Sequence, residues 1–256
     1  MKKQIQQELR HLEEQLDIKI LYAVESGSRA WGFASADSDR DVRFLYIHRP
    51  EWYLQIDTER DSYEKILPDD IDLSGWELRK ALRLFRKSNP PMLEWLHSPL
   101  IYSEPFTTAA RLRGLESSCF SPKSCLHHYL HMAENNFKEY LLRDTVRVKK
   151  YFYVIRPLLA CDWIRDRGTM PPVEFAGLVN AYAGEGAVRR EIDALQERKM
   201  AGAELGEAPR NHTLHAFLEA KLHEYQHYVR QIPSAPEPGT KLLNELFRET
   251  LAEVWA

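Results

Sequence analysis

The sequence predicts an α+β protein, in which a mixed sheet with helices is followed by an all-α region. Two observations predict this class. Apolar, β-branched runs typical of buried strands fall in the first part of the chain, and strand signals nearly vanish from Pro105 onwards, where helical patterns continue. Strands first and helices afterwards favour a sheet-containing half with a helical bundle attached. We therefore expect two domains, residues 1–104 and 105–256.

The first half divides into short elements. Residues 1–16 predict a helix with one apolar stripe, made of Ile5, Leu9, Leu12 and Leu16. Ser74 and Glu77 form a capping-box pattern, which predicts a helix over 75–87. The remaining expected elements are strands over 18–24 and 42–47, a short helix over 50–54, one or two strands within 60–73, a helix over 92–97 and an extended run over 100–102.

The second half reads as helices separated by Gly- and Pro-rich loops. Pro157 falls inside one of these helices, where it removes a hydrogen bond and predicts a kink. The expected helices cover 122–143, 145–165, 172–182, 187–200, 212–231 and 240–255.

Composition narrows the class of protein. The 256 residues carry a net charge of −3, which argues against a non-specific nucleic-acid coat but allows a small basic groove. Three cysteines without C-x-x-C spacing are typical of reduced cytosolic thiols rather than disulfides or a zinc site. The charged, amphipathic start is unlike a signal peptide, and no apolar run is long enough to span a membrane. We expect a cytoplasmic protein that does not bind membranes.

The most informative segment lies between the first two predicted strands. Gly27 lets backbone N–H groups approach a phosphate, and Ser28 adds a hydroxyl donor. Asp39 and Asp41 lie two apart on a strand, so both carboxylates point to the same face. Two carboxylates bind Mg²⁺ well once substrate phosphates complete the coordination. This pattern predicts a metal-dependent nucleotide site.

A third carboxylate is available further along the chain. Asp72 lies between two apolar residues on a short predicted strand, and in a sheet its side chain can lie beside Asp39 and Asp41. Asp70 shares a strand face with Asp72 and is an alternative for this position. Three carboxylates around two metal ions suit an in-line displacement at phosphorus.

These residues resemble a known family. Gly27-Ser28, ten residues, Asp39-x-Asp41 and a later Asp72 between apolar residues resemble the signature of the DNA polymerase β-like nucleotidyltransferase superfamily. The strings GSRAWGFASADSDRDVRF and DIDLSGWELRKALRLFRKSNPPMLEWL resemble one branch, the RNA-ligase-associated nucleotidyltransferase (RlaP-like) family of bacteria and phages. The resemblance covers residues 15–105 closely and 148–160 more loosely.

The resemblance implies a polymerase β-like fold and an activity. Asp39, Asp41 and Asp72 would bind two Mg²⁺ ions, or Mn²⁺ in their place, and Gly27 and Ser28 would hold the triphosphate of an NTP such as ATP. The enzyme would transfer an NMP to an acceptor hydroxyl and release pyrophosphate. An RNA end is the first expectation for the acceptor. A protein, a small molecule such as an aminoglycoside, and a non-catalytic nucleotide-binding module remain alternatives.

Several basic and aromatic residues are further candidates for substrate contacts. Lys149 and Lys150 mix with aromatic residues on a predicted helix, where they can hold a nucleotide or an acceptor strand. The alternative is a helix with its aromatic side chains inward and its lysines in solvent. Arg29 is expected at the nucleotide; Arg40, Arg43 and Lys80 are weaker candidates for phosphate contacts, and Trp31 and Trp76 for base stacking.

A second short motif points to different chemistry. His223-Glu224-Tyr225-Gln226-His227 is a literal H-E-x-x-H, the pattern of zinc metalloproteases. Its two histidines lie off the apolar stripe of their predicted helix, so we expect them to face solvent. His127 and His131 have the same spacing and the same interpretation.

Overall fold

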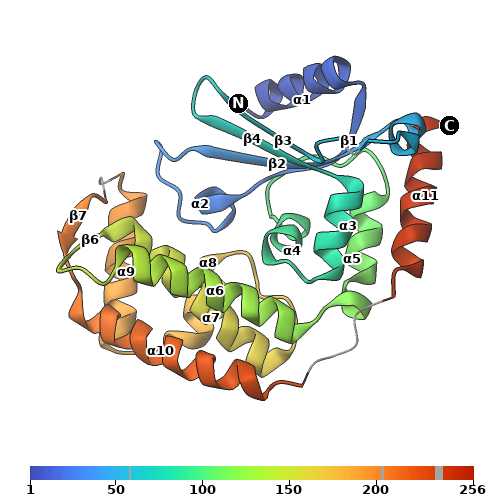
Figure 1. Ribbon diagram of the computed structural model, residues 1–256. Coiled ribbons are helices and arrows are strands. Elements are labelled where there is room, and N and C mark those ends of the chain that lie inside the picture. Colours follow the sequence, from blue (N-terminus) through green and yellow to red (C-terminus); the bar gives the residue numbers. More distant parts are fainter. Residues whose placement is uncertain (58, 203–204, 234–238) are drawn as a thin grey trace.

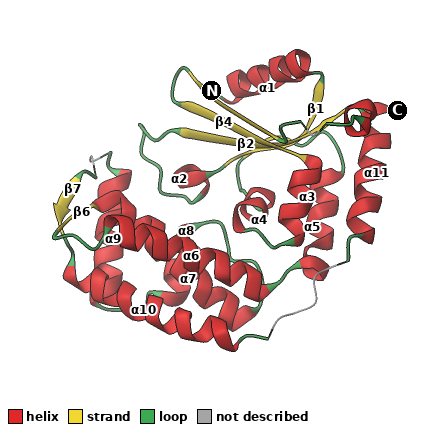
Figure 2. Cartoon of the chain, viewed as in Figure 1, coloured by secondary structure: helices red, strands yellow, loops and turns green. Residues whose placement is uncertain are grey.

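The computed structural model describes residues 1–57, 59–202, 205–233 and 239–256. Five of its strands form one mixed sheet, and a layer of helices lies beneath it (Figures 1 and 2). The strand order is β3-β4-β2-β1-β5, with β2 and β4 parallel and the other neighbours antiparallel. The strands span Ile18–Glu25 (β1), Arg40–His48 (β2), Ser62–Leu67 (β3), Ile71–Glu77 (β4) and Ile101–Ser103 (β5). The predicted mixed sheet is confirmed.

The two faces of the sheet are buried against different helices. Helix α1 (Lys2–Leu16) covers one face, where its Ile5 and Leu9 join a cluster with Val42 and Phe44. Helices α3 (Leu78–Arg86), α4 (Pro90–Leu96) and α5 (Thr108–Cys119) lie on the other side (Figure 1). Apolar side chains that alternate along a strand are divided between the two faces, which keeps the strands in register.

The predicted capping box at Ser74 is wrong. Ser74 lies within β4, paired opposite Arg43 of β2, and the strand continues to Glu77. Glu77 itself caps α3, because its Oε2 accepts a hydrogen bond of 2.8 Å from the Arg79 backbone N–H. Strand pairing satisfies the backbone of residues 74–77, so the helix begins three residues later than the local pattern predicts.

The second half is mainly helical, as predicted. Ser121 caps α6, and α6 and α7 form the most extensive helix contact in the molecule. Pro157 lies inside α7 as expected. The helices span Pro122–Tyr140 (α6), Phe152–Arg167 (α7), Phe175–Tyr182 (α8), Ala187–Met200 (α9) and His212–Gln231 (α10).

The expected helix over 145–165 needs a correction at its start. Thr145–Arg147 forms strand β6, which pairs with β7 (Glu207–Pro209), and a 3-10 turn (Val148–Tyr151) leads into α7. The partner strand lies some 60 residues later in the chain. A hydrogen bond from the Asn211 N–H to the Tyr151 hydroxyl joins the same two segments. A pairing this distant leaves no local periodicity to detect.

The last helix returns to the first half. Helix α11 (Lys241–Trp255) packs beside α3 and α5 (Figure 1). Trp255 Nε1 donates to the carbonyl of His48, and Phe247 packs edge-on against Tyr53. One buried apolar cluster includes residues from Leu21 to Leu246. The boundary near residue 104 stays a prediction.

In the described part of the chain, every helix is too short or too polar to cross a lipid bilayer.

Candidate active site

Two of the predicted carboxylates meet near the start of the adjacent strands β2 and β4. Asp41 and Asp72 are direct partners in the parallel pairing of β2 with β4, so their side chains project from the same face. Both are partly exposed, at 30% and 39%. Asp70 lies outside the strand, in a turn with φ of +53°, and its carbonyl accepts from the Arg40 N–H. The register therefore places Asp72, and not Asp70, beside Asp41.

A single guanidinium connects the two carboxylates. Arg43 lies two residues after Asp41 on the same face, and its Nη2 donates to both Asp41 Oδ1 and Asp72 Oδ2 at 2.8 Å. Burial raises the pKa of the Asp41 carboxyl, an effect that Arg43 opposes and Asp72 strengthens. Arg43 thus supplies the positive charge that keeps two neighbouring carboxylates together.

The Gly-Ser turn packs directly against Asp41. Gly27 begins a one-turn helix, α2 (Gly27–Ala30), with φ of +60°, and a Cβ atom there would lie 2.0 Å from Asp41 Oδ2. The Ser26 N–H donates to the Asp41 carbonyl at 2.8 Å. Glycine is required here for both its backbone conformation and its lack of a side chain.

A buried carboxylate that the sequence analysis missed supports this turn. Glu25 is fully buried, and its Oε1 accepts from the Asp41 backbone N–H at 2.7 Å. Tyr102 donates to its other oxygen. Burial raises the pKa of Glu25. A charged residue that ends an apolar strand directly before the motif was the available signal.

Asp41 and Arg43 line a cavity of about 430 Å³ between the sheet and the helices. Its wall includes an ion pair in which Arg156 donates to Glu94 at 2.7 Å, with the guanidinium also 4.6 Å from the Trp31 ring. Trp76 stacks on Trp95 at 3.8 Å, so both predicted base-stacking tryptophans line the cavity but already have partners. Arg156 and Pro157 of α7 thus face the motifs of the first half.

Asp39 lies on the loop that leads into β2 and not on the strand as predicted, and Arg29 lies in α2. Asp39 is exposed, and its charge contributes to the raised pKa of Asp41. The Arg29 guanidinium donates to the carbonyls of Ala36, Ser38 and Asp39, so it organises this loop. Ser28 is half-buried beside Gly27. It is not one of the described residues that line the cavity.

The predicted lysines line a neighbouring cavity of about 500 Å³. Tyr153 borders both cavities, so they adjoin. Lys149 lies near enough to lower the pKa of Asp41, whereas the Lys150 ammonium lies 3.9 Å from the Tyr140 ring centre. The structure brings Lys149 towards the carboxylates and holds Lys150 on an aromatic face.

Lys199 was not predicted and reaches this region from α9. Its Nζ donates to the hydroxyls of Ser35 and Ser38 at 3.2 Å, on the loop before Asp39. Burial lowers the pKa of Lys199, and the charge of Lys149 lowers it further. The partner residues are more than 160 positions away, so no local pattern indicates the contact.

The remaining basic candidates have structural partners. Arg40 lies 3.8 Å from buried Glu25, and Lys80 donates to Asp61 at 3.2 Å. These contacts account for both charges without a phosphate.

The histidine motifs lie away from the carboxylates. His223 and His227 are exposed, as expected, and His227 contacts Gln231. Glu224 accepts from Arg165 at 2.5 Å. His127 and His131 are also exposed on α6. The buried stripe of α10 consists of other residues, among them Leu218, Leu222 and Tyr225.

The donor set at Asp41 fits a hard divalent cation in part. Carboxylate oxygens are the ligands that Mg²⁺ prefers, and the absence of a side chain at Gly27 lets the Asp41 carboxylate lie against the backbone there. Over the described ranges, however, no three His, Cys, Asp or Glu side chains converge closely enough to hold a metal ion. Two carboxylates converge here, so phosphate oxygens of a bound nucleotide would complete the coordination.

The five-stranded mixed sheet with its surrounding helices has the polymerase β-like nucleotidyltransferase fold. The model of the RNA repair pathway DNA polymerase beta family (RlaP) matches residues 1–249. The chain belongs to this family, which confirms the resemblance found in the sequence.

Individual relatives are less informative. The chain is 48% identical over 255 residues to the uncharacterized protein YcgL of Bacillus subtilis (strain 168), covering 100% of this chain and 98% of the relative. A nucleotidyltransferase-like protein from Exiguobacterium sibiricum 255-15 matches with a TM-score of 0.32 and 12% identity, over 98% of this chain and 88% of that one. A TM-score this low does not itself establish a common fold.

Proposed function

We propose that this protein transfers an NMP from an NTP to an acceptor hydroxyl and releases pyrophosphate in a Mg²⁺-dependent reaction. The observation that carries the proposal is the pairing of Asp41 with Asp72 across two parallel strands, directly against the Gly27 turn. Carboxylates beside a glycine turn, with cationic side chains around them, suit a triphosphate and its counter-ions.

Each residue would have a definite task. Asp41 and Asp72, with Asp39 from the adjoining loop, would hold Mg²⁺, or Mn²⁺ in its place. Two bound ions would neutralise the triphosphate and activate the attacking hydroxyl. Gly27 and Ser28 would admit the phosphates to the backbone, and Lys149 and Lys199 would add positive charge at the cavity edge. Most of the rate enhancement would come from positioning and charge neutralisation.

We propose an RNA end as the acceptor. The family description names RNA repair, and the basic cavity at Lys149 and Lys150 adjoins the carboxylate cavity through Tyr153. A strand end in this cavity would meet two lysines and an aromatic ring, the side chains that hold single-stranded nucleic acids.

A label-transfer assay tests both parts. The wild type and an Asp39→Ala/Asp41→Ala variant are each mixed with an α-labelled NTP, Mg²⁺, and separated RNA, protein and metabolite fractions. We expect label in the RNA fraction with the wild type alone. Label in the protein or metabolite fraction would show that the acceptor is not RNA, while the proposed NMP transfer would stand. Tight NTP binding without transfer to any fraction would favour a nucleotide-binding module.

A further inference from the structure

A further cavity lies between α3 and α11, and arginines line it. Its volume is about 310 Å³. Helix α3 contributes Arg79, Arg83 and Arg86, which lie on one helical face because they are spaced by four and three residues. This cavity shares no lining residue with the one around Asp41, so its ligand is separate from the proposed transfer chemistry.

The positive charge of this cavity has little compensation from the protein. Its lining contains no Asp or Glu. Arg79 has partners, since it lies 4.0 Å from Glu77 and 4.7 Å from the Tyr53 ring. Within the described part of the chain, Arg83 and Arg86 pair with no acidic side chain, and the buried Nε of Arg86 has no acceptor. A buried donor without an acceptor and like charges on one face are both unfavourable, and an anion would relieve both.

The first turn of α11 adds to this attraction. Thr240 and Asn244 line the cavity. Thr240 is the N-cap of α11, yet its side chain makes no capping hydrogen bond and the first turn carries no acidic residue. The free N–H groups and positive end of a helix favour an anion at this place. The other walls are apolar, and they consist of Leu82, Leu243 and Phe247.

We propose that this cavity binds a phosphate monoester carried on a nucleoside. Guanidinium groups match phosphate oxygens with paired hydrogen bonds, and the apolar walls suit the body attached to the phosphate. The volume is at the lower end of small-molecule sites, which excludes a bulky ligand. A free nucleotide and the phosphorylated end of an RNA strand share this chemistry.

Binding by the full chain tests the proposal. Two probes are used. Calorimetry measures the binding of AMP, and fluorescence anisotropy measures the binding of one short oligoribonucleotide that carries either a 5′-phosphate or a 5′-hydroxyl. We expect R83A/R86A to weaken binding of the phosphorylated probe at least about tenfold, because charge-assisted hydrogen bonds are lost. The 5′-hydroxyl probe should bind the wild type and R83A/R86A alike.

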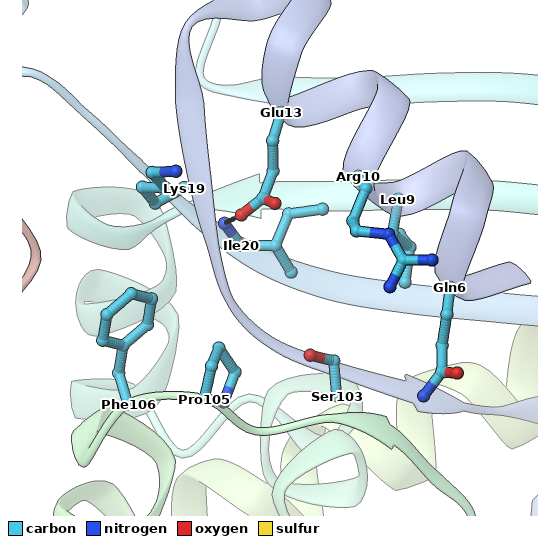
Figure 3. Close-up of a pocket in the computed structure, with 9 residues that line it drawn as sticks. All are labelled: Gln6, Leu9, Arg10, Glu13, Lys19, Ile20, Ser103, Pro105 and Phe106. Atoms are coloured by element: carbon cyan, nitrogen blue, oxygen red, sulfur yellow. Dashed lines mark hydrogen bonds between the residues drawn. The ribbon is translucent and has the colours of Figure 1, made fainter.

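A matched control removes the same charge elsewhere. Arg10 and Lys19 line a different cavity between α1 and β1, together with Glu13, whose carboxylate accepts from the Ile20 N–H (Figure 3). R10A/K19A should bind the phosphorylated probe as the wild type does. A second test variant, Thr240→Asp, places a carboxylate at the cavity while favouring the helix cap, so it should fold and still lose binding.

Two outcomes support the proposal and identify the source of the phosphate. Weaker AMP binding indicates a nucleotide site, and weaker binding of the phosphorylated strand alone indicates an RNA end. The proposal is overturned if neither probe binds the wild type, if the Arg83/Arg86 and Thr240 variants bind normally, or if R10A/K19A weakens binding equally.

Discussion

Two short motifs typical of metal chemistry lie in different halves of this molecule, and their side chains have different surroundings. Asp41 of the D-x-D motif faces Asp72, with Arg43 bound to both carboxylates. His223 and His227 of the H-E-x-x-H motif face solvent. Spacing within an element determines only which side chains share a face. Whether they form a site depends on what the neighbouring element places opposite them.

The neighbouring elements explain the difference. Strand β2 pairs in parallel with β4, which places a second carboxylate in register with Asp41. Helix α10 buries an apolar stripe instead, and the Glu224 carboxylate of its motif already accepts from Arg165. Four sets of variants test how the surroundings of these side chains determine what they do.

The largest effect is expected at Asp41. Asp41→Asn removes a charge from the paired carboxylates while keeping the shape, so we expect NMP transfer to fall by at least about 1,000-fold, as when one member of a catalytic group is removed. Transfer rates in the label assay measure this. His223→Gln/His227→Gln is the matched control and should retain full activity. A fully active Asp41→Asn protein would remove Asp41 from the mechanism.

The next contrast lies at the start of β4. Asp72→Asn should lower transfer by about 100-fold or more, whereas Asp70→Asn should change it less than about threefold, because only Asp72 lies in register with Asp41. Each variant loses one carboxylate, so the two variants have the same net charge and differ only in the position of the change. The reverse order of activities would make Asp70 the third carboxylate.

Two glycines separate steric fit from backbone strain. Gly27→Ala places a Cβ 2.0 Å from Asp41 Oδ2 at φ +60°, whereas at Gly32, with φ +86°, a Cβ meets no atom within 4 Å. Both variants should lose about 1–3 kcal/mol from strain, with the greater loss in Gly27→Ala. Denaturant unfolding measures stability, and only Gly27→Ala should also lose transfer activity. Equal activities would show that Asp41 adapts to the extra methyl group.

The smallest effect concerns a carboxylate at the other end of β4. Glu77 is buried, and burial raises its pKa, although Tyr53 and the Arg79 N–H bind its carboxylate. A raised pKa in the folded state means that the native protein binds the proton more tightly. The resulting stability is complete below the unfolded pKa near 4.5 and is lost as pH rises through the folded value.

Glu77→Gln has no such titration. The free energy of unfolding of the wild type relative to Glu77→Gln should therefore rise as pH falls from neutral towards 4.5. Urea unfolding of both proteins across this range measures the difference. A constant difference would mean that Glu77 titrates alike in the folded and unfolded chains.

The sequence predicted the site best where its residues are local to one segment. The glycine turn, the D-x-D spacing and most helices depend on neighbours in the chain, and they were found. Glu25 and Lys199 depend on folding, because each contacts the motif from a separate element. The choice between Asp70 and Asp72 needed the strand register, which sequence spacing alone does not determine.

Local patterns also failed where pairing overrode them. Ser74 and Glu77 have the right spacing for a capping box, but hydrogen bonds to β2 hold Ser74 in a strand. Thr145–Arg147 has a strand partner far along the chain. In both places a distant backbone satisfied groups that local structure would otherwise have satisfied.

The return of α11 to the sheet affects how the protein is made. Trp255 and His48 are 207 residues apart, yet they are joined by a hydrogen bond at the side of the sheet-containing half. Contacts between distant residues slow folding, because a long loop must close before they form. During synthesis, the strands and the Asp41–Asp72 pair can leave the ribosome well before α11 exists. The α11-facing surfaces of α3 and α5 therefore stay uncovered until α11 itself has been synthesised.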